Sequence, residues 1–529
     1  MKKYIAIVAV AMFNMPLLAQ ETYENTKLVD NDLDGTAKYV GMGGAMEALG
    51  ADISTMSTNP AGIGLFRRSQ IIGSMSVTSQ QDAQSFSPGH KTIVNFDQAG
   101  FVYSSRVSPT SFLNIGFNYH KSRNFNQLLN AGGRLVNASQ NKLTYQKFRN
   151  DVFKINPADG KIRDLTYTQV DALYMDNLLY NEYDDAYYNY PATSYRYDGA
   201  HQGYIGEYDF NFSGNINDRV YLGVTIGIHD VNYKHYSEYS ETFEPNLDDI
   251  NGLTLCDERK ITGSGIDVKA GIIVRPIEES PFRIGAYVNT PTWYDLTTEN
   301  MTSLTDGNKR FYSAYTSDGR PTTEIYDYKV YTPWKFGVSL GHTIDKYLAL
   351  GATYEYADYS TMSSRIIDGE SYGWYYDSFY KSSHKDLNMN DHTNYTLKGV
   401  STVKVGAEFK PDPAIAIRLG YNYVSPMFDK LGSKNGAIHS PGVYYESQTN
   451  YTNWKSTNRL TCGVGWALDN HVNLDLSYQY SAQNGDFYPF MNYYENDVDG
   501  APSPEDNHCD ATKVSNKRHQ LLLTLGYRF

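Results

Sequence analysis

Apolar and polar residues alternate with a period of two in many parts of the chain, and the last such part is the carboxy terminus itself. Within residues 519–529, one parity holds Leu521, Leu523, Leu525, Tyr527 and Phe529, and the other holds mostly polar or small residues. A period of two predicts a β-strand with two unlike faces. Because an open apolar edge invites aggregation, we expect the apolar face to meet lipid and the strand to pair with the first strand, near residues 69–78.

The same alternation recurs upstream, for example in residues 220–230, 414–423 and 472–480. The polar parity of these segments carries many glycines and few bulky groups, which is typical of a lumen or a crowded interior. The apolar parity ends in tyrosine, where the aromatic girdle of a membrane barrel lies.

The connections between these segments alternate between two kinds. Six are short turns, at 107–111, 215–219, 275–281, 343–346, 410–414 and 468–470. Seven are long, polar and rich in Tyr and Asn, at roughly 79–91, 122–203, 236–262, 293–330, 361–398, 428–456 and 483–516. Together they join fourteen strands of about 9–11 residues, the length that a tilted strand needs to cross a bilayer. Lipid offers no hydrogen bonds, so such a sheet must close.

The sequence therefore predicts an all-β fold, a transmembrane antiparallel β-barrel of about 14 strands over residues 69–529, with long extracellular loops. Residues 1–20 combine a basic start, an apolar core and a small-residue cleavage site near Ala19 or Gln20, which indicates a signal peptide. Export without a helical span leaves the periplasm, secretion or an outer-membrane barrel, and the strand and loop pattern favours the outer membrane of a Gram-negative bacterium. The expected partners are membrane lipids and lipopolysaccharide, and we expect a monomer.

Composition and motifs exclude other classes of function. A formal charge of −13 argues against nucleic acid as a partner. The chain has no HExxH or GxSxG motif, so we expect no enzyme activity and no cofactor. We also expect no metal site, because the acidic run at 30–35 lacks the spacing of a calcium loop. The three cysteines, Cys256, Cys462 and Cys509, show no motif spacing and are interpreted as incidental.

Residues 21–68 do not alternate and contain a small-residue run, 41–50. A short helix is expected over 51–57, capped by Asp52 or Ser54, and it must end at Asn59 because a residue before proline disfavours helix. Fourteen strands enclose more space than their own side chains fill. We therefore expect residues 21–68 to form an N-terminal hatch that plugs the lumen.

The segment GMGGAMEALGADISTMSTNPAGIGLFRR, residues 41–68, resembles the amino-terminal hatch of the FadL/TodX family of outer-membrane transporters. Residues 287–296, with Pro291 and Trp293, and residues 331–340, with Pro333 and Trp334, resemble further landmarks of that family. The resemblance implies a channel for passive, ligand-gated uptake of small hydrophobic molecules, fatty-acid-like or aromatic, through lumenal binding and hatch or lateral opening.

The resemblance also implies roles for particular residues. Those of the hatch turn are Asn59, Pro60, Ala61 and Gly62. The third strand of the family kinks inward to open a lateral route, and Gly116 is one position for such a kink; a glycine that packs against the hatch is the other interpretation.

Three basic residues face the lumen by parity and could hold a ligand carboxylate: Lys335, Lys404 and Arg418. The alternative is that they pair with Glu355, Glu408 or a hatch acid such as Asp52. An alternative function also stays open. A barrel of this kind can act as a protein-docking or secretion-associated component, for which long Tyr- and Asn-rich loops would be suited.

Overall fold

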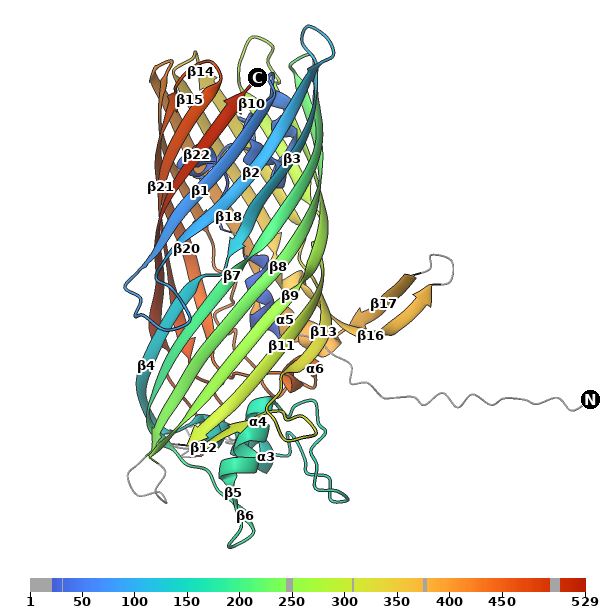
Figure 1. The fold of residues 1–529 in the computed structure, drawn as a ribbon, viewed down its shortest axis with the longest axis vertical. Helices are drawn as coiled ribbons and strands as arrows, with labels where there is room; N and C mark the ends of the chain where they lie inside the picture. The colour runs from blue at the N-terminus through green and yellow to red at the C-terminus, as the bar shows by residue number, and fades with distance from the viewer. Residues whose placement is uncertain (1–20, 31, 244–250, 307–308, 374–377, 495–504) are drawn as a thin grey trace, which may run out of the picture.

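The computed structural model describes residues 21–30, 32–243, 251–306, 309–373, 378–494 and 505–529. Antiparallel strands follow one another around a closed wall, and the wall has fourteen positions, which we call staves (Figure 1). The first eight staves consist of β1 (Gln70–Gln81), β2 (Thr92–Arg106), β3 (Phe112–Asn124) with β4 (Gln127–Ala138), β7 (Ala192–Ile216), β8 (Val220–Phe243), β9 (Gly252–Val274), β10 (Arg283–Asn289) with β11 (Trp293–Asp306), and β13 (Glu324–Tyr331) with β14 (Lys335–Ile344).

The remaining staves are β15 (Leu348–Asp358), β18 (Gly399–Asp412), β19 (Ile415–Val424), β20 (Tyr451–Ala467), β21 (Val472–Tyr488) and β22 (Thr512–Arg528). After β15 and the short η4 (Tyr359–Thr361), the hairpin of β16 (Ser363–Gly373) and β17 (Ser378–Lys385) projects outward from the wall (Figure 1). It is followed by α5 (Leu387–Thr396) and, after β19, by α6 (Pro441–Tyr444).

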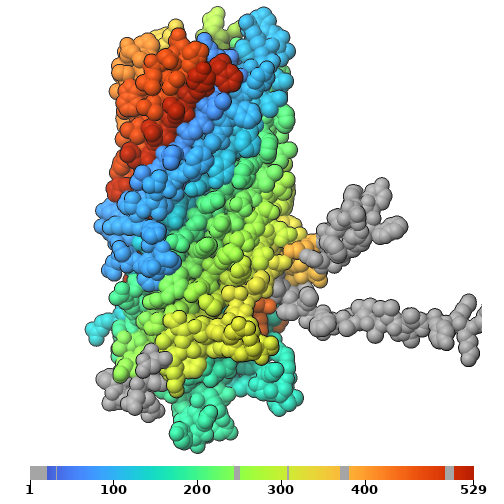
Figure 2. Space-filling view, in the orientation of Figure 1, coloured from blue at the N-terminus to red at the C-terminus, as the bar shows by residue number. Residues whose placement is uncertain are grey.

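The barrel closes by pairing its last strand with its first. The β1–β22 ladder runs from Gln70 opposite Arg528 to Gln81 opposite Lys517. The amide of Phe529 adds one more bond, donating to the Ser69 carbonyl at 3.0 Å. The two chain-distant strands lie side by side on the outer surface, dark red beside blue (Figure 2). The predicted fold class and the predicted pairing of the carboxy-terminal strand are confirmed.

An apolar belt surrounds part of the wall. On β8 the outward residues Leu222, Val224, Ile226 and Ile228 are each more than 40% exposed, being 47%, 46%, 42% and 43%. The next outward positions on the same strand are Asp230, Asn232 and Lys234. An aliphatic belt on a closed antiparallel sheet is the surface of an outer-membrane barrel, in which every backbone group pairs inside the wall. No helix in the described ranges is both long and apolar enough to cross a bilayer.

The six short turns lie where they were predicted, but much of the predicted loop sequence is strand. Residues 236–262 were expected to be a loop, yet β8 continues to Phe243 and β9 begins at Gly252. The strands continue past the belt, where the outward residues of β8 are polar and the apolar outward face that marks the belt ends. Tyrosine favours strands on half-buried surfaces, so the Tyr-rich composition indicated wall rather than loop.

The end of the barrel with long connections is covered by a helical layer (Figure 1). It contains α3 (Gln140–Arg149), α4 (Gln169–Tyr174), the single π-helical turn η3 (Met175–Leu179) and the short strands β5 (Tyr180–Asn181), β6 (Ala186–Tyr187) and β12 (Lys309–Tyr312). Its apolar residues, including Phe153 and Tyr174, form one buried cluster with wall residues such as Tyr239 and Phe487. The cluster joins staves from several sides of the rim and so covers the mouth.

Residues 21–30 and 32–66 lie inside the barrel as α1 (Thr22–Val29), α2 (Ala37–Gly41), η1 (Ile53–Ser57) and η2 (Pro60–Leu65) (Figure 1). We call this segment the hatch. The short helix expected over 51–57 is present as the 3-10 helix η1, and the Asp52 carboxylate caps it by accepting from the Ser54 amide at 3.0 Å. The signal-peptide prediction falls on residues 1–20, which lie outside the described residues.

A charge placed in the belt tests the membrane-facing surface. We expect Ile226→Arg to lower the free energy of unfolding in lipid by about 2–4 kcal/mol, because the guanidinium would lie among acyl chains. The matched control is Asn232→Arg, on the same face of β8 but beyond the belt, for which we expect about 0–1 kcal/mol. Urea titration of the barrel refolded in vesicles measures both, and equal losses would contradict this position of the belt.

Candidate functional site in the barrel lumen

The turn Asn59-Pro60-Ala61-Gly62 fixes the hatch to the wall. The Asn59 carbonyl oxygen Oδ1 accepts from the Ala61 amide at 3.2 Å and its Nδ2 donates to the Glu47 carbonyl at 3.1 Å. Asn59 and Ala61 have no exposed surface. The turn lies against Gly223 of β8 and Gly271 of β9, where any side chain would overlap Pro60 or Asn59. The turn therefore depends on bare backbone in the wall.

The small-residue run of the hatch contacts the opposite wall in the same way. A side chain at Gly406 of β18 would overlap the Met42 carbonyl, and one at Gly351 of β15 would overlap the Ala45 carbonyl. Packed interiors leave no room for added atoms of this kind. This contact explains the glycines on the lumenal parity of the strands.

The three basic residues predicted to face the lumen are ion-paired. Lys404 Nζ lies 2.9 Å from Glu47 Oε1 of the hatch, and Lys335 Nζ lies 3.7 Å from Glu355 Oε1. Arg418 bridges two carboxylates, Glu408 and Asp475, at 2.6 Å each. These contacts favour the paired alternative, with Glu47 and Asp475 as partners that the sequence did not suggest. The proposed contact of these residues with a ligand headgroup stays a prediction.

Gly116 lies in an uninterrupted part of the third stave, paired with Val102 on one side and Asn211 on the other. A side chain there would overlap Met56 of η1, so the glycine packs against the hatch, as the second interpretation had it. The third stave does become irregular, but further along the chain than Gly116. Pairing of β2 with β3 ends at Gln98 opposite His120, although β2 extends back to Thr92.

Beyond His120 the third stave leaves β2. Its register with β7 shifts between Lys121 and Arg123, and Phe125 and Asn126 separate β3 from β4. The next strand, β4, exchanges two hydrogen bonds with the Gln80 side chain of β1: Gln80 Nε2 donates to the Leu128 carbonyl at 2.7 Å, and the Leu128 amide donates to Gln80 Oε1 at 2.8 Å. We call residues 121–126 the break in the third stave.

The hatch holds this break. Arg123 Nη1 lies 2.8 Å from Asp30 Oδ2 and 3.3 Å from Asp32 Oδ1. The Asp32 amide donates to the Ser122 carbonyl at 3.3 Å, and the Asn124 amide donates to Asp32 Oδ2 at 2.8 Å. Two hatch carboxylates therefore satisfy the backbone and side-chain groups that leave the β-ladder at this point.

An aromatic cavity of about 110 Å³ lies between α1, the break and the neighbouring wall. Tyr23 of α1 stacks on Phe428 with ring centroids 5.0 Å apart, and its ring centroid lies 5.1 Å from that of Tyr451. Phe125, from the break itself, meets Tyr233 edge-on at 5.0 Å. We call this the aromatic cavity. Its polar lining consists of charged and histidine side chains, two threonines and several amides, the first of these being Glu24, Lys27, Asp30, Arg123 and His201.

Ion pairs anchor α1 beside this cavity. Arg259 Nη1 of β9 lies 2.7 Å from Glu24 Oε2, and Lys27 Nζ lies 2.8 Å from the same oxygen. Burial alone would raise the pKa of Glu24, but the two cations hold the pKa of this carboxyl well below its usual range. Gln448 Nε2 of the loop after β19 donates to Glu24 Oε1 at 3.0 Å. The helix is thus fixed to both wall and loop.

The two proline landmarks interrupt neighbouring staves at the same level. Pro291 separates β10 from β11, and Pro333 separates β13 from β14. Proline cannot donate to the ladder. Threonines supply other contacts: the Thr332 amide donates to the Thr292 carbonyl at 3.2 Å, and the Thr292 amide to Thr332 Oγ1 at 2.7 Å. Trp293 and Trp334 are 39% and 49% exposed, as membrane-interface aromatics are.

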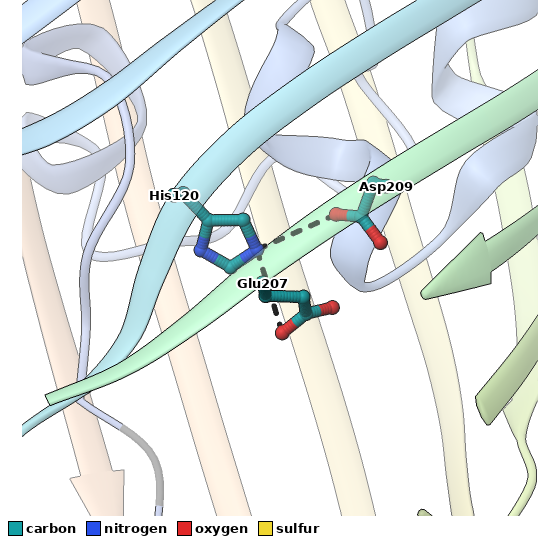
Figure 3. A group of neighbouring side chains, drawn as sticks. All are labelled: His120, Glu207 and Asp209. Carbon is teal, nitrogen blue, oxygen red and sulfur yellow. Dashed lines mark ion pairs between the residues drawn. The ribbon is translucent and has the colours of Figure 1, made fainter. Parts of the chain in front are cut away.

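A cluster of titratable side chains lies on the lumenal face of β3, β7, β8 and β9, and Figure 3 shows three of them, His120, Glu207 and Asp209. His229, Asp267 and Lys269 complete it. No motif in the sequence pointed to this cluster. Strand parity places each residue inside, but only the register of four adjacent strands brings them together.

Comparison with known proteins gives similarity of fold. No family model matches the chain, and no curated protein matches it. Among solved structures, the toluene transporter TbuX of Ralstonia pickettii aligns over 94% of this chain and 99% of its own, at 14% identity and a TM-score of 0.46. A FadL homologue of Pseudomonas aeruginosa aligns over 95% and 100%, at 11% identity and a TM-score of 0.49.

The toluene transporter TodX of Pseudomonas putida aligns over 94% of this chain and 98% of its own, at 11% identity and a TM-score of 0.45. TodX and the FadL homologue carry the names of the family that residues 41–68 resemble. At identities this low, the functional conclusion depends on the residues of this chain.

Enlarging a wall glycine tests the contact between hatch and wall. We expect Gly406→Val to lower the free energy of unfolding by about 1–3 kcal/mol, the usual cost of overpacking. Amide hydrogen exchange should rise in residues 37–50 because Met42 must move. Gly73→Val on β1, where an added Cβ meets nothing within 4 Å, is the control and should change neither quantity. Unchanged exchange in Gly406→Val would contradict the close approach.

Proposed function

We propose that the protein is an outer-membrane channel for the passive, ligand-gated uptake of small hydrophobic molecules. The observation that carries the proposal is the aromatic cavity beside a break in the third stave, with hatch residues holding the break. A ligand cavity, an opening in the wall and a movable plug are the three parts that such transport needs. The resemblance of residues 41–68 to the FadL/TodX hatch agrees with it.

The size and lining of the aromatic cavity favour an aromatic ligand over a long acyl chain. A cavity of about 110 Å³ is of the order of one ring, since an engineered apolar cavity of about 150 Å³ binds benzene. Tyr23, Tyr233 and Phe428 offer ring edges and faces, the geometry in which aromatic groups attract one another. Lys27 and Arg123 would contact a polar substituent on the ring of such a ligand.

Phe125 connects the cavity with the route outward. Its ring lines the cavity, and its backbone lies in the break between β3 and β4. On the outer surface beside the break, Phe96 of β2 stacks on Tyr119 of β3 with centroids 6.1 Å apart. A ligand leaving through the break would enter lipid at this aromatic level. Burial of each methylene gains about 0.8 kcal/mol, so the step into lipid is favourable without a water-filled stage.

The ion pairs of Arg123 with Asp30 and Asp32 are the proposed gate. These contacts close the break while α1 packs around the cavity. A ligand that binds more tightly when α1 is displaced shifts the population toward the open state, and it needs a differential affinity to do so. Because Asp30 and Asp32 directly follow α1, displacement of the helix moves both carboxylates away from Arg123.

The second candidate function is protein docking. The observation that favours it is the β16–β17 hairpin, which projects from the wall and offers exposed strand edges (Figure 1). Exposed edges accept a further strand from another chain. Docking predicts that a secreted protein co-purifies with the barrel and that deletion of the hairpin abolishes this association, with uptake unaffected.

A reversible cross-link between hatch and break tests the channel. In a Cys462→Ser background, which removes the exposed thiol, Asp32→Cys and Ser122→Cys place two cysteines on residues joined by a backbone hydrogen bond. We expect oxidation to reduce uptake of a radiolabelled monoaromatic hydrocarbon by cells at least about tenfold, and reduction to restore it. Each single-cysteine variant is a control. Equal uptake in the oxidised and reduced double variant would contradict the proposal.

Ligand binding can be separated from gating. We expect Phe125→Ala to weaken binding of the same hydrocarbon to the purified barrel by about tenfold, since one aromatic contact contributes about 0.5–1.5 kcal/mol beyond area burial. Phe117→Ala on the outward face of β3 removes an equal ring that does not line the cavity and should leave the affinity unchanged. Equal affinities in the two variants would place the ligand elsewhere.

A further inference from the structure

We propose that His120, Glu207 and Asp209 form a binding site for one divalent transition-metal cation of the Zn²⁺ class, with the fourth position of a tetrahedron taken by water. His120 comes from β3 and Glu207 and Asp209 from β7, and His229 of β8 lies beside Glu207. All four side chains face the lumen and are at most 8% exposed. The proposal is independent of the hydrophobic cargo and adds a cation site to the wall itself.

The ligand atoms converge without bonding one another. His120 Nε2 lies 3.5 Å from Glu207 Oε2 and 3.4 Å from Asp209 Oδ2, as the dashed lines show (Figure 3). His229 Nδ1 lies 3.8 Å from the same Glu207 oxygen. His120 Nε2, Asp209 Oδ2 and His229 Nδ1 are buried and make no hydrogen bond. A buried polar atom without a partner requires an explanation, and an ion bound by the native molecule is one such explanation.

The spacing suits tetrahedral coordination. Zn²⁺ binds imidazole nitrogen and carboxylate oxygen at about 2.0–2.2 Å, so two ligands of a tetrahedron lie about 3.3–3.6 Å apart. The two distances from His120 Nε2 fall in this range. A direct hydrogen bond between imidazole and carboxylate would be shorter, about 2.7–2.9 Å. Ca²⁺ and Mg²⁺ prefer oxygen ligands, so the imidazole of His120 favours a transition metal.

Neighbouring side chains hold the two carboxylate ligands in place. His229 Nδ1 points toward Glu207, because Nε2 of that ring lies 3.0 Å from Asp267 Oδ2. Lys269 Nζ binds Glu207 Oε1 at 2.6 Å, Asp267 Oδ1 at 2.7 Å and Asp209 Oδ1 at 3.3 Å. The ammonium group of Lys269 therefore binds the carboxylate oxygens that point away from the histidines.

Charge balance supports a dication. Three carboxylates and one ammonium give the six-residue cluster a net charge of −2 when both histidines are neutral. A divalent cation brings that charge to zero. An isolated charge of −2 in a buried site is costly.

The site can be reached from the lumen. Two cavities meet it: one of about 110 Å³ that His120 and Glu207 line together with hatch acids, and one of about 70 Å³ lined by His229 and Asp267. His120 is also the last residue of β3 that pairs with β2. A bound cation would therefore join β3 to β7 directly before the third stave leaves its neighbour.

Metal stoichiometry and spectroscopy test the site. The purified barrel is stripped with a chelator, reloaded with Zn²⁺ or Co²⁺, and freed of excess metal. We expect one Zn²⁺ per chain by elemental mass spectrometry, and a visible Co²⁺ absorption of tetrahedral intensity. His120→Gln and Asp209→Asn should weaken Zn²⁺ binding by more than about 100-fold, and Asp267→Asn by about 10–100-fold, as loss of a supporting group does.

The matched control is His235→Gln. His235 is another buried histidine of β8 and lies 2.9 Å from an aspartate, Asp257, but it belongs to neither group of converging ligands. The His235→Gln variant should bind Zn²⁺ as the unmodified chain does. The proposal is overturned if the unmodified chain takes up no Zn²⁺, or if His120→Gln binds it unchanged. Where a variant does not fold, as judged by heat-modifiable gel mobility, the stoichiometry and Co²⁺ spectrum of the unmodified chain decide.

Discussion

The fold depends on one constraint: a backbone in lipid must find every hydrogen-bond partner within its own wall. The chain meets it by joining strands that are more than 400 residues apart in sequence, Gln70 of β1 with Arg528 of β22. Closure with fourteen staves creates a lumen too wide for wall side chains to fill. The hatch fills it, and wall glycines such as Gly223 and Gly406 let hatch backbone approach wall backbone. Membrane insertion, hatch and glycine content thus follow from one requirement.

Filling the lumen with a separate segment makes ion pairs necessary. The lumenal face of the wall carries charged residues, and the hatch buries them. Lys404 with Glu47, and Arg123 with Asp30 and Asp32, join hatch to wall where either partner alone would be left charged and buried. Such ion pairs fix the position of the hatch more than they stabilise the folded protein.

Much of the wall could be predicted from the sequence, because a period of two needs no knowledge of neighbours. The belt residues of β8, the six short turns and the first-to-last pairing follow from parity and turn spacing. The outer halves of the strands could not be predicted, since outside lipid the outward face of β8 turns polar at Asp230 and resembles loop sequence. The alternation along the strand also predicted that Lys404 faces the lumen. Its partner Glu47 could not be predicted in this way, because it lies 357 residues away in the hatch.

The histidine–carboxylate cluster marks the limit of such prediction. His120 and Glu207 have no shared motif, and they meet only because β3 pairs with β7 in one register. A shift of one residue would turn one of them toward lipid. Gly116 shows the converse: glycine in a strand is compatible with either a bend or a close contact, and only the position of Met56 distinguishes them.

The apolar cover over the mouth has a consequence for the cell. Within the described ranges, the layer of α3 and α4 covers one end of the barrel and the hatch occupies the lumen beyond it. On the proposed function, ions and hydrophilic antibiotics would meet a plugged lumen, even while a lateral exit released hydrophobic cargo into the bilayer. A bacterium could therefore carry many copies of this barrel at high density without losing its permeability barrier.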